Sequence, residues 1–137
     1  MRCGRKMKPT ITGISLFLLG AAALHALFMI CELFPWRLSI LLRVVSKKLP
    51  ELPAPEKGRF TDAQRKLVAN IVRNAGIYNA IVAGGLFWAA FGGDSATDVA
   101  RVLLIGAAVA GVFGTATLKS PITAVQALVG IIGFILV

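Results

Sequence analysis

Four long apolar runs, separated by short polar segments, dominate this chain of 137 residues. A run as long as the first is sufficient for one helix to cross the hydrocarbon of a bilayer, whereas the last is short for that purpose. The pattern predicts an all-α protein, an integral membrane four-helix bundle that forms one membrane domain over residues 1–137. The predicted spans lie at about 11–34, 67–91, 99–118 and 122–137, and a basic loop (37–66) joins the first two.

The loop after the first run has its own pattern. Residues 37–49 alternate basic and apolar side chains, which is typical of a short amphipathic helix that lies on an anionic bilayer surface. The alternative is a helical extension of the bundle with a solvated basic face. Residues 50–55 contain three prolines and predict an exposed connection. Thr61 and Gln64, three residues apart, predict a capping box at the start of the next helix.

Composition agrees with a membrane protein: 57% of the residues are hydrophobic and only 15% are charged, with a mean hydropathy of +0.80. The net charge of +9 does not indicate nucleic-acid binding, because the basic residues flank apolar runs as membrane anchors do. Cys3 and Cys31 are expected on opposite sides of the membrane, which argues against a disulfide or a shared metal ion. We interpret the first run as an uncleaved transmembrane helix, not as a signal peptide.

The distribution of Lys and Arg predicts the orientation. With four spans, the first and third loops lie on one side of the membrane, and they carry more basic residues than the tail and the second loop. We therefore expect the long basic loop in the cytoplasm and both termini on the opposite side. The expected location is the bacterial inner membrane, with the mitochondrial inner membrane as the alternative. The lipid bilayer is the expected partner, with anionic lipids at the basic loop.

Ionisable groups inside a membrane span are costly, so Glu32 and His25 in the first run are candidates for function. Seven residues are almost two helical turns, so the two side chains share one helix face. Asn74 and Tyr78 are expected to face them from the second helix, together with Asn70, and Arg73 is the candidate counter-ion for Glu32. Polar residues from all four helices fall in the same half of the membrane. The candidate ligand- or proton-binding residues are His25, Glu32, Asn74, Tyr78, Asn79 and Gln126.

Each of these residues also has a structural interpretation. A neutral His25 imidazole hydrogen-bonded between helices explains that residue without any activity, and Glu32 would then extend toward Arg37 or pair with Arg73. The functional interpretation makes Glu32 a binding site for a proton or a cation. Small residues at four-residue spacing predict close helix packing within the bundle, or alternatively a homodimer face. They are Gly106, Ala110, Gly111 and Gly114.

Several blocks of this sequence resemble a family of small bacterial four-helix membrane proteins known as domain of unknown function 1304. They include His25 with Glu32-Leu33-Phe34, the segment 74–79 (NAGIYN), the segment 83–88 (AGGLFW), the segment 109–117 (VAGVFGTAT) and Gln126. The resemblance runs from about Leu19 onward and leaves out the basic N-terminal tail. It implies a four-span bundle and importance for His25, Glu32, Asn74, Tyr78 and Asn79, but no activity. The chain departs from the family pattern at Ala75, where glutamine is usual, and at Ala80, where glycine is frequent.

No catalytic pattern, metal-ligand spacing or phosphate-binding loop occurs in the sequence, so we expect no cofactor and no metal. Three classes of function remain. The first is a structural or accessory subunit of a membrane assembly. The second is a proton- or cation-coupled transporter of small molecules that acts as a homodimer. The third is a membrane enzyme that acts on a lipophilic substrate, and we favour the two non-enzymatic classes.

Overall fold

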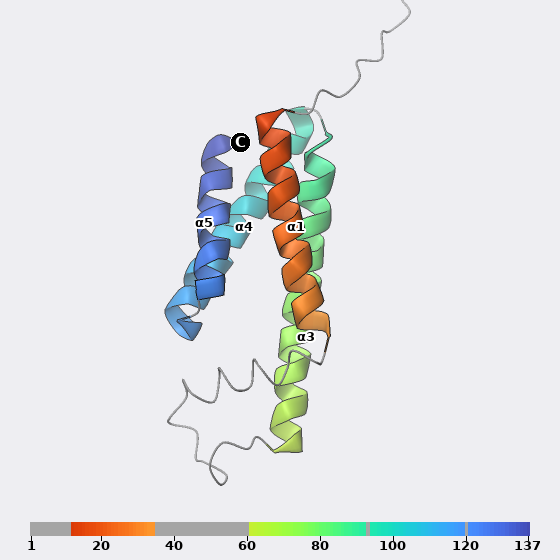
Figure 1. Cartoon of the computed structure of the whole chain (residues 1–137), viewed down its shortest axis with the longest axis vertical. Helices are drawn as coiled ribbons and strands as arrows, with labels where there is room; N and C mark the ends of the chain where they lie inside the picture. Colours follow the sequence, from red (N-terminus) through yellow and green to blue (C-terminus); the bar gives the residue numbers. More distant parts are fainter. Residues whose placement is uncertain (1–11, 35–60, 93, 120) are drawn as a thin grey trace, which may run out of the picture.

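The computed structural model describes residues 12–34, 61–92, 94–119 and 121–137, and every regular element in these ranges is an α-helix (Figure 1). The predicted all-α four-helix bundle is therefore confirmed. The amphipathic helix predicted at 37–49 lies outside the described residues. The helices are α1 (Gly13–Leu33), α3 (Asp62–Ala89), α4 (Asp94–Leu118) and α5 (Pro121–Leu136).

Hydroxyl groups at helix starts determine where α1 and α3 begin. The Thr12 side chain accepts a hydrogen bond from the Ser15 backbone N–H at 3.2 Å. At α3 the predicted capping box is present: the Gln64 N–H donates to the Thr61 hydroxyl at 3.2 Å, and the Thr61 N–H donates to the Gln64 side chain at 2.9 Å. These bonds satisfy backbone donors that have no partner inside the helix. As this capping box predicted, α3 begins at Asp62, before the apolar span predicted from residue 67.

Thr61→Ala is expected to destabilise the first turns of α3 by about 1 kcal/mol, because the capping hydroxyl is lost. Amide hydrogen exchange should show faster exchange at residues 62–65 and unchanged exchange near Leu86, which lies in the packed half of the same helix. Equal acceleration along all of α3 would contradict a purely local role for the cap.

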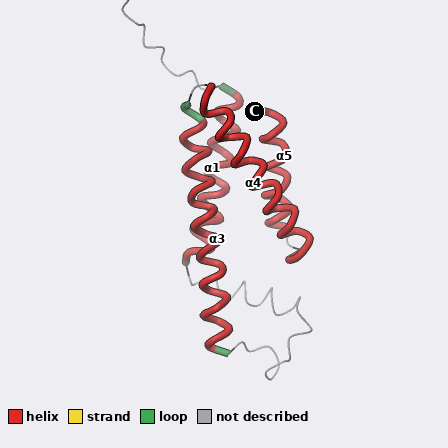
Figure 2. Tube along the Cα trace, turned by 180° about the vertical axis from the view of Figure 1, so that it is seen from behind, coloured by secondary structure: helices red, strands yellow, loops and turns green. Residues whose placement is uncertain are grey.

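The four helices pack as two antiparallel pairs, α1 with α3 and α4 with α5 (Figures 1 and 2). Small residues at the interfaces permit close approach of the backbones. A Cβ atom on Gly111 of α4 would lie 2.6 Å from the Ala127 Cα of α5, and one on Gly130 of α5 would lie 2.7 Å from the Leu104 carbonyl oxygen of α4. At Gly111 and Gly130, the backbones of α4 and α5 therefore lie in direct contact.

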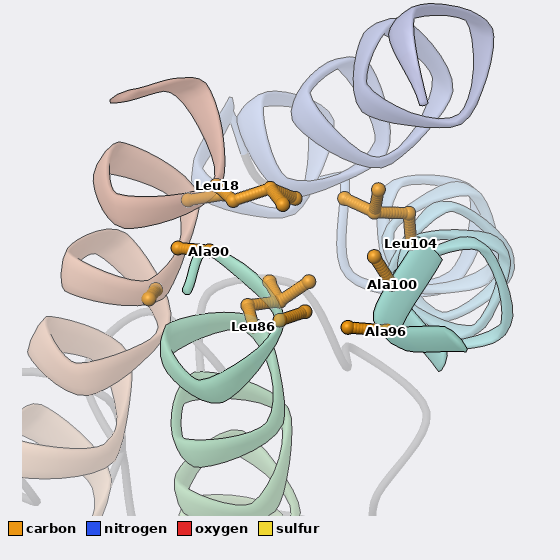
Figure 3. Close-up of a cluster of buried hydrophobic side chains, with 9 residues drawn as sticks. Leu18, Leu86, Ala90, Ala96, Ala100 and Leu104 are labelled. Atoms are coloured by element: carbon orange, nitrogen blue, oxygen red, sulfur yellow. The ribbon is translucent and has the colours of Figure 1, made fainter. Parts of the chain in front are cut away.

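The two pairs meet at the end of the molecule where α1 begins and α3 ends. Leu86 of α3 and Leu104 of α4 are completely buried there, among small and branched side chains from α1, α3 and α4 (Figure 3). Gly133 of α5 joins this region, since its Cβ position faces Phe17 and Leu104. Toward the opposite end the two pairs diverge (Figures 1 and 2). The molecule therefore has one closed end and one open end.

Two of the described helices, Gly13–Leu33 and Ala96–Leu118, are long and apolar enough to cross a membrane. The helix α5 is apolar but shorter, and α3, which carries polar residues along much of its length, is not among the helices that meet this criterion. The observed length and composition thus support two of the four predicted spans.

Candidate functional site

The buried side of α3 consists mainly of small residues, with one amide and one leucine among them. Gly76, Asn79, Ala83 and Leu86 are buried and follow one another at steps of three and four, which places them on one helix face. A Cβ atom on Gly76 would lie 3.0 Å from the Leu33 Cγ and 3.2 Å from the Glu32 Cβ. The last turn of α1 therefore packs directly on the α3 backbone at Gly76, and Asn79 is carried into the interface one turn further on.

Three side chains in this interface form a continuous chain of hydrogen bonds. The Asn79 Nδ2 donates to Glu32 Oε2 at 2.7 Å, and the Asn79 Oδ1 lies 2.8 Å from the His25 Nδ1. Because a carbonyl oxygen only accepts, the His25 Nδ1 must carry the hydrogen in this arrangement. If the Asn79 side-chain amide were rotated by about 180°, its oxygen would lie against the Glu32 carboxylate in place of the nitrogen, and it could not donate the hydrogen bond found there. The cluster His25–Asn79–Glu32 thus joins two turns of α1 to one residue of α3.

Burial differs sharply along this cluster. His25 has no exposed surface and Asn79 is 8% exposed, whereas Glu32, in the last turn of α1, is only partly buried. The His25 ring also packs edge-on against Phe28, with the ring centres 5.8 Å apart. Its Nε2 is the only polar side-chain atom of the described residues that is both buried and without a hydrogen-bond partner. The cluster therefore runs from a sealed interior end to a more open end near Leu33.

The other residues predicted on this face of α3 lie elsewhere. Asn74 is exposed and Tyr78 is 63% exposed, so the prediction that they face His25 and Glu32 is wrong. Small residues allow α3 to approach α1 closely, and this favours the face with Gly76, Asn79 and Ala83 over the face with Asn74 and Tyr78.

Arg73 does not form the predicted ion pair with Glu32. The ion pair found among the described residues joins Arg101 and Asp98, 3.5 Å apart on the α4 surface. Arg73 is exposed and lies one turn before Gly76, the position that already faces the end of α1. Its side chain is therefore beyond the packed interface, and the Asn79 amide takes the position expected for the counter-ion.

The prediction that polar groups of all four helices meet in one cluster is also wrong. Gln126 lies on α5, partly buried, in the pair that diverges from α1 and α3. Within that pair, the Thr115 hydroxyl donates to the Gly111 carbonyl at 2.7 Å and lies 3.2 Å from the Thr123 hydroxyl. The hydrogen bonds of Thr115 therefore stay within the α4–α5 pair, and those of Asn79 stay within the α1–α3 pair.

The four residues predicted to pack helices divide into two groups. Gly111 and Gly114 are buried against α5, where a Cβ atom on Gly114 would lie 2.8 Å from the Thr123 Cγ2. Gly106 and Ala110 are exposed, and a Cβ atom on Gly106 would meet nothing within 4 Å. Only one side of α4 is therefore used for packing inside the chain.

An open apolar groove of about 410 Å³ lies on the α4–α5 pair, toward the end where the pairs diverge. Alanine and branched apolar side chains line it, and Thr115 is its one polar residue. The lining residues are Val112, Thr115, Ala116, Ala124, Ala127, Leu128 and Ile131. No group of three or more His, Cys, Asp or Glu suited to a metal ion occurs among the described residues. The two features that stand out are this groove and the His25–Asn79–Glu32 cluster.

The architecture defines a small all-α protein with large apolar side chains outside and a polar cluster inside. The family model of DUF1304, described as a protein of unknown function, matches residues 19–137. The chain therefore belongs to the DUF1304 family, as the resemblance in its sequence indicated. No curated protein and no solved structure matches it.

Proposed function

We propose that this chain is an integral membrane protein that serves as a structural or accessory subunit of a larger membrane assembly. The observation that carries this proposal is the joining of the two helix pairs at one end only. A four-helix bundle that functions alone would be expected to cover its inner faces along their whole length. Here the α4–α5 pair leaves an apolar groove uncovered toward its open end.

The distribution of large apolar side chains supports a position in the bilayer. Isoleucine, leucine, valine and phenylalanine residues are exposed on all four helices, up to 74% at Ile135, while much of the interior is alanine and glycine. A soluble monomer rarely exposes contiguous apolar surface of this extent. In a bilayer the same arrangement is favourable, because lipid covers the large side chains and small residues permit helix contact. The His25–Asn79–Glu32 cluster is hydrogen-bonded between two helices, which lowers the cost of placing these polar side chains in hydrocarbon.

The groove suits a transmembrane helix of a partner protein. Its alanines, Ala116, Ala124 and Ala127, leave room for the side chains of an incoming helix, and packing of this kind drives association in lipid. The groove has no ionisable lining residue, which does not favour a site for a charged transported solute. The same absence of acid and base groups there does not favour enzymatic chemistry on a lipophilic substrate. We therefore rank homodimeric transport and catalysis below an accessory role.

The exposed basic residues fit the orientation expected from the sequence. Arg65 and Lys66 lie on the first turns of α3, which extend past the end of α1, and Arg73 follows about two turns later. Basic side chains at this level are favourable next to anionic headgroups of the cytoplasmic leaflet. We propose that this end faces the cytoplasm of a bacterium, or the equivalent side of the mitochondrial inner membrane.

Filling the groove is expected to weaken the assembly. Ala116→Leu adds a large side chain to the groove wall, whereas Ala110→Leu makes the same change on an exposed part of α4 outside the groove. After extraction in mild detergent, wild type and Ala110→Leu should migrate as a complex of defined stoichiometry, and Ala116→Leu should lose the partner at least about tenfold, which corresponds to about 1.4 kcal/mol. Recovery of stable, monomeric wild type from native membranes would contradict the accessory role.

A further inference from the structure

The His25–Asn79–Glu32 cluster has two outer atoms that its hydrogen bonds do not use. One is the Nε2 of His25 and the other is the second carboxylate oxygen, Oε1, of Glu32. The two inner bonds are compatible with a proton at either outer atom. Glu32 Oε2 accepts from the amide whether or not Oε1 carries a hydrogen, and His25 Nδ1–H donates whether or not Nε2 does. The cluster can therefore change its proton content without reversing a hydrogen bond.

The two outer atoms differ in whether water can reach them. The His25 Nε2 is sealed, and a hydrogen added there would be a buried donor with no acceptor, which is an expensive arrangement. Glu32 is partly buried in the last turn of α1, and its Oε1 is not among the buried atoms that lack a partner. The carboxylate oxygen is thus the outer atom that water at the end of α1 can reach.

Among the described residues, the charged groups near Glu32 leave this oxygen available. On α1 the titratable neighbours are His25, linked through Asn79, and Cys31, which is partly buried. On α3, the helix packed against Glu32, Gly76 and Asn79 face the acid, and the nearest cation along the helix, Arg73, is exposed and forms no ion pair with it. The described residues of α4 and α5 belong to the diverging pair.

From this geometry we propose that the His25–Asn79–Glu32 cluster is a binding site for a single exchangeable proton, held on Glu32 Oε1. Asn79 is a positioning residue, because it fixes Oε2 by hydrogen bonding and leaves Oε1 facing the open end. His25 stays neutral and holds the amide in its orientation. The site stores a proton between α1 and α3 without opening the interface, and this role adds to the accessory function and does not depend on it.

Infrared spectroscopy of the full-length chain in lipid nanodiscs tests this proposal. As the pH is raised above about 5, where exposed carboxyl groups are already ionised, the carbonyl band of one protonated carboxylic acid should disappear. The band change should be absent in Glu32→Gln and present in Asp98→Asn, because Asp98 is an exposed acid outside the cluster. A band change that persists in a folded Glu32→Gln variant would overturn the proposal, as would its absence from wild type.

A second measurement on the unmodified chain covers the case in which Glu32→Gln does not fold. A hydrophobic carbodiimide reacts with protonated carboxyl groups, so mass spectrometry should locate the adduct at Glu32. The labelled fraction should fall about tenfold per pH unit above the transition, as for one titrating group. Labelling at Glu32 that does not vary with pH, or no labelling at any pH, would contradict proton exchange at this site.

Discussion

Gly111→Ala is expected to be among the most damaging single-methyl changes in this protein. The added Cβ would meet the backbone of α5 at the Ala127 nitrogen, and it would lie 2.6 Å from the Ala127 Cα and 2.8 Å from the Thr123 carbonyl oxygen. Backbone atoms in a helix cannot move aside individually, so α4 and α5 must separate. We expect a loss of about 1–3 kcal/mol in the free energy of unfolding, as for other overpacked interiors.

Gly106→Ala is the matched control for this substitution. It makes the same change on the same helix, but its Cβ would meet nothing within 4 Å. Since alanine favours helix by about 1 kcal/mol over glycine, this variant should be as stable as wild type or slightly more stable. Reversible unfolding in mixed micelles measures both variants, and equal stability of the two would show that α4 and α5 do not pack through Gly111.

Asn79→Leu is expected to have the second large effect. Leucine has a similar size, but it removes both hydrogen bonds and leaves the His25 Nδ1–H without its acceptor in a fully buried place. In soluble proteins, a buried donor that loses its acceptor costs about 1–3 kcal/mol. Hydrogen bonds between membrane helices contribute about 0.6 kcal/mol on average and up to about 1.7 kcal/mol. For two bonds we expect a loss of about 1–3 kcal/mol, measured in the same unfolding assay.

Asn74→Leu serves as the comparison for Asn79→Leu, because Asn74 is exposed on the same helix. Its substitution should leave the stability of the α1–α3 pair unchanged. If Asn74→Leu destabilised the chain more than Asn79→Leu, the assignment of the buried face of α3 would be incorrect.

The elements of this fold were largely predictable from the sequence. The four apolar runs, together with the capping box at Thr61, predicted all four described helices, and most of their ends lie close to the predicted ones. Hydropathy places the starts of the apolar spans at residues 67 and 99, whereas α3 begins at Asp62, as the capping box predicted, and α4 begins at Asp94. The polar ends of these two helices carry no apolar signal, so hydropathy alone missed their first turns.

The candidate site was predicted only in part. His25, Glu32 and Asn79 were all identified as polar residues within or next to apolar runs, and the structure brings them together. The rotation of α3 was assigned incorrectly, because the Asn70–Asn74–Tyr78 stripe was given more weight than the small residues. The 3–4–3 spacing of Gly76, Asn79, Ala83 and Leu86 was the signal that could have located the interface. In lipid, close approach at small residues outweighs a polar stripe that headgroups or water can solvate.

The positions of the polar residues along their helices did not predict that the helices form two separate pairs. The position of a polar residue along its helix contains no information on which helices are neighbours at that level. Gly111 and Gly130 favour α4 with α5, and Gly76 favours α1 with α3, so the polar groups are divided between two interfaces. Gln126 and Thr115 therefore do not reach the cluster around His25.

The hydrogen state of the imidazole tests the central claim most directly, since His25 is the only histidine in the chain. Nitrogen NMR of the histidine-labelled full chain in lipid nanodiscs assigns the hydrogen to one ring nitrogen. The arrangement of His25, Asn79 and Glu32 predicts a neutral ring with the hydrogen on Nδ1 and a bare Nε2, and a loss of this preference in Asn79→Leu. A ring with its hydrogen on Nε2, or one whose state does not respond to Asn79→Leu, would contradict the hydrogen-bonded chain between α1 and α3.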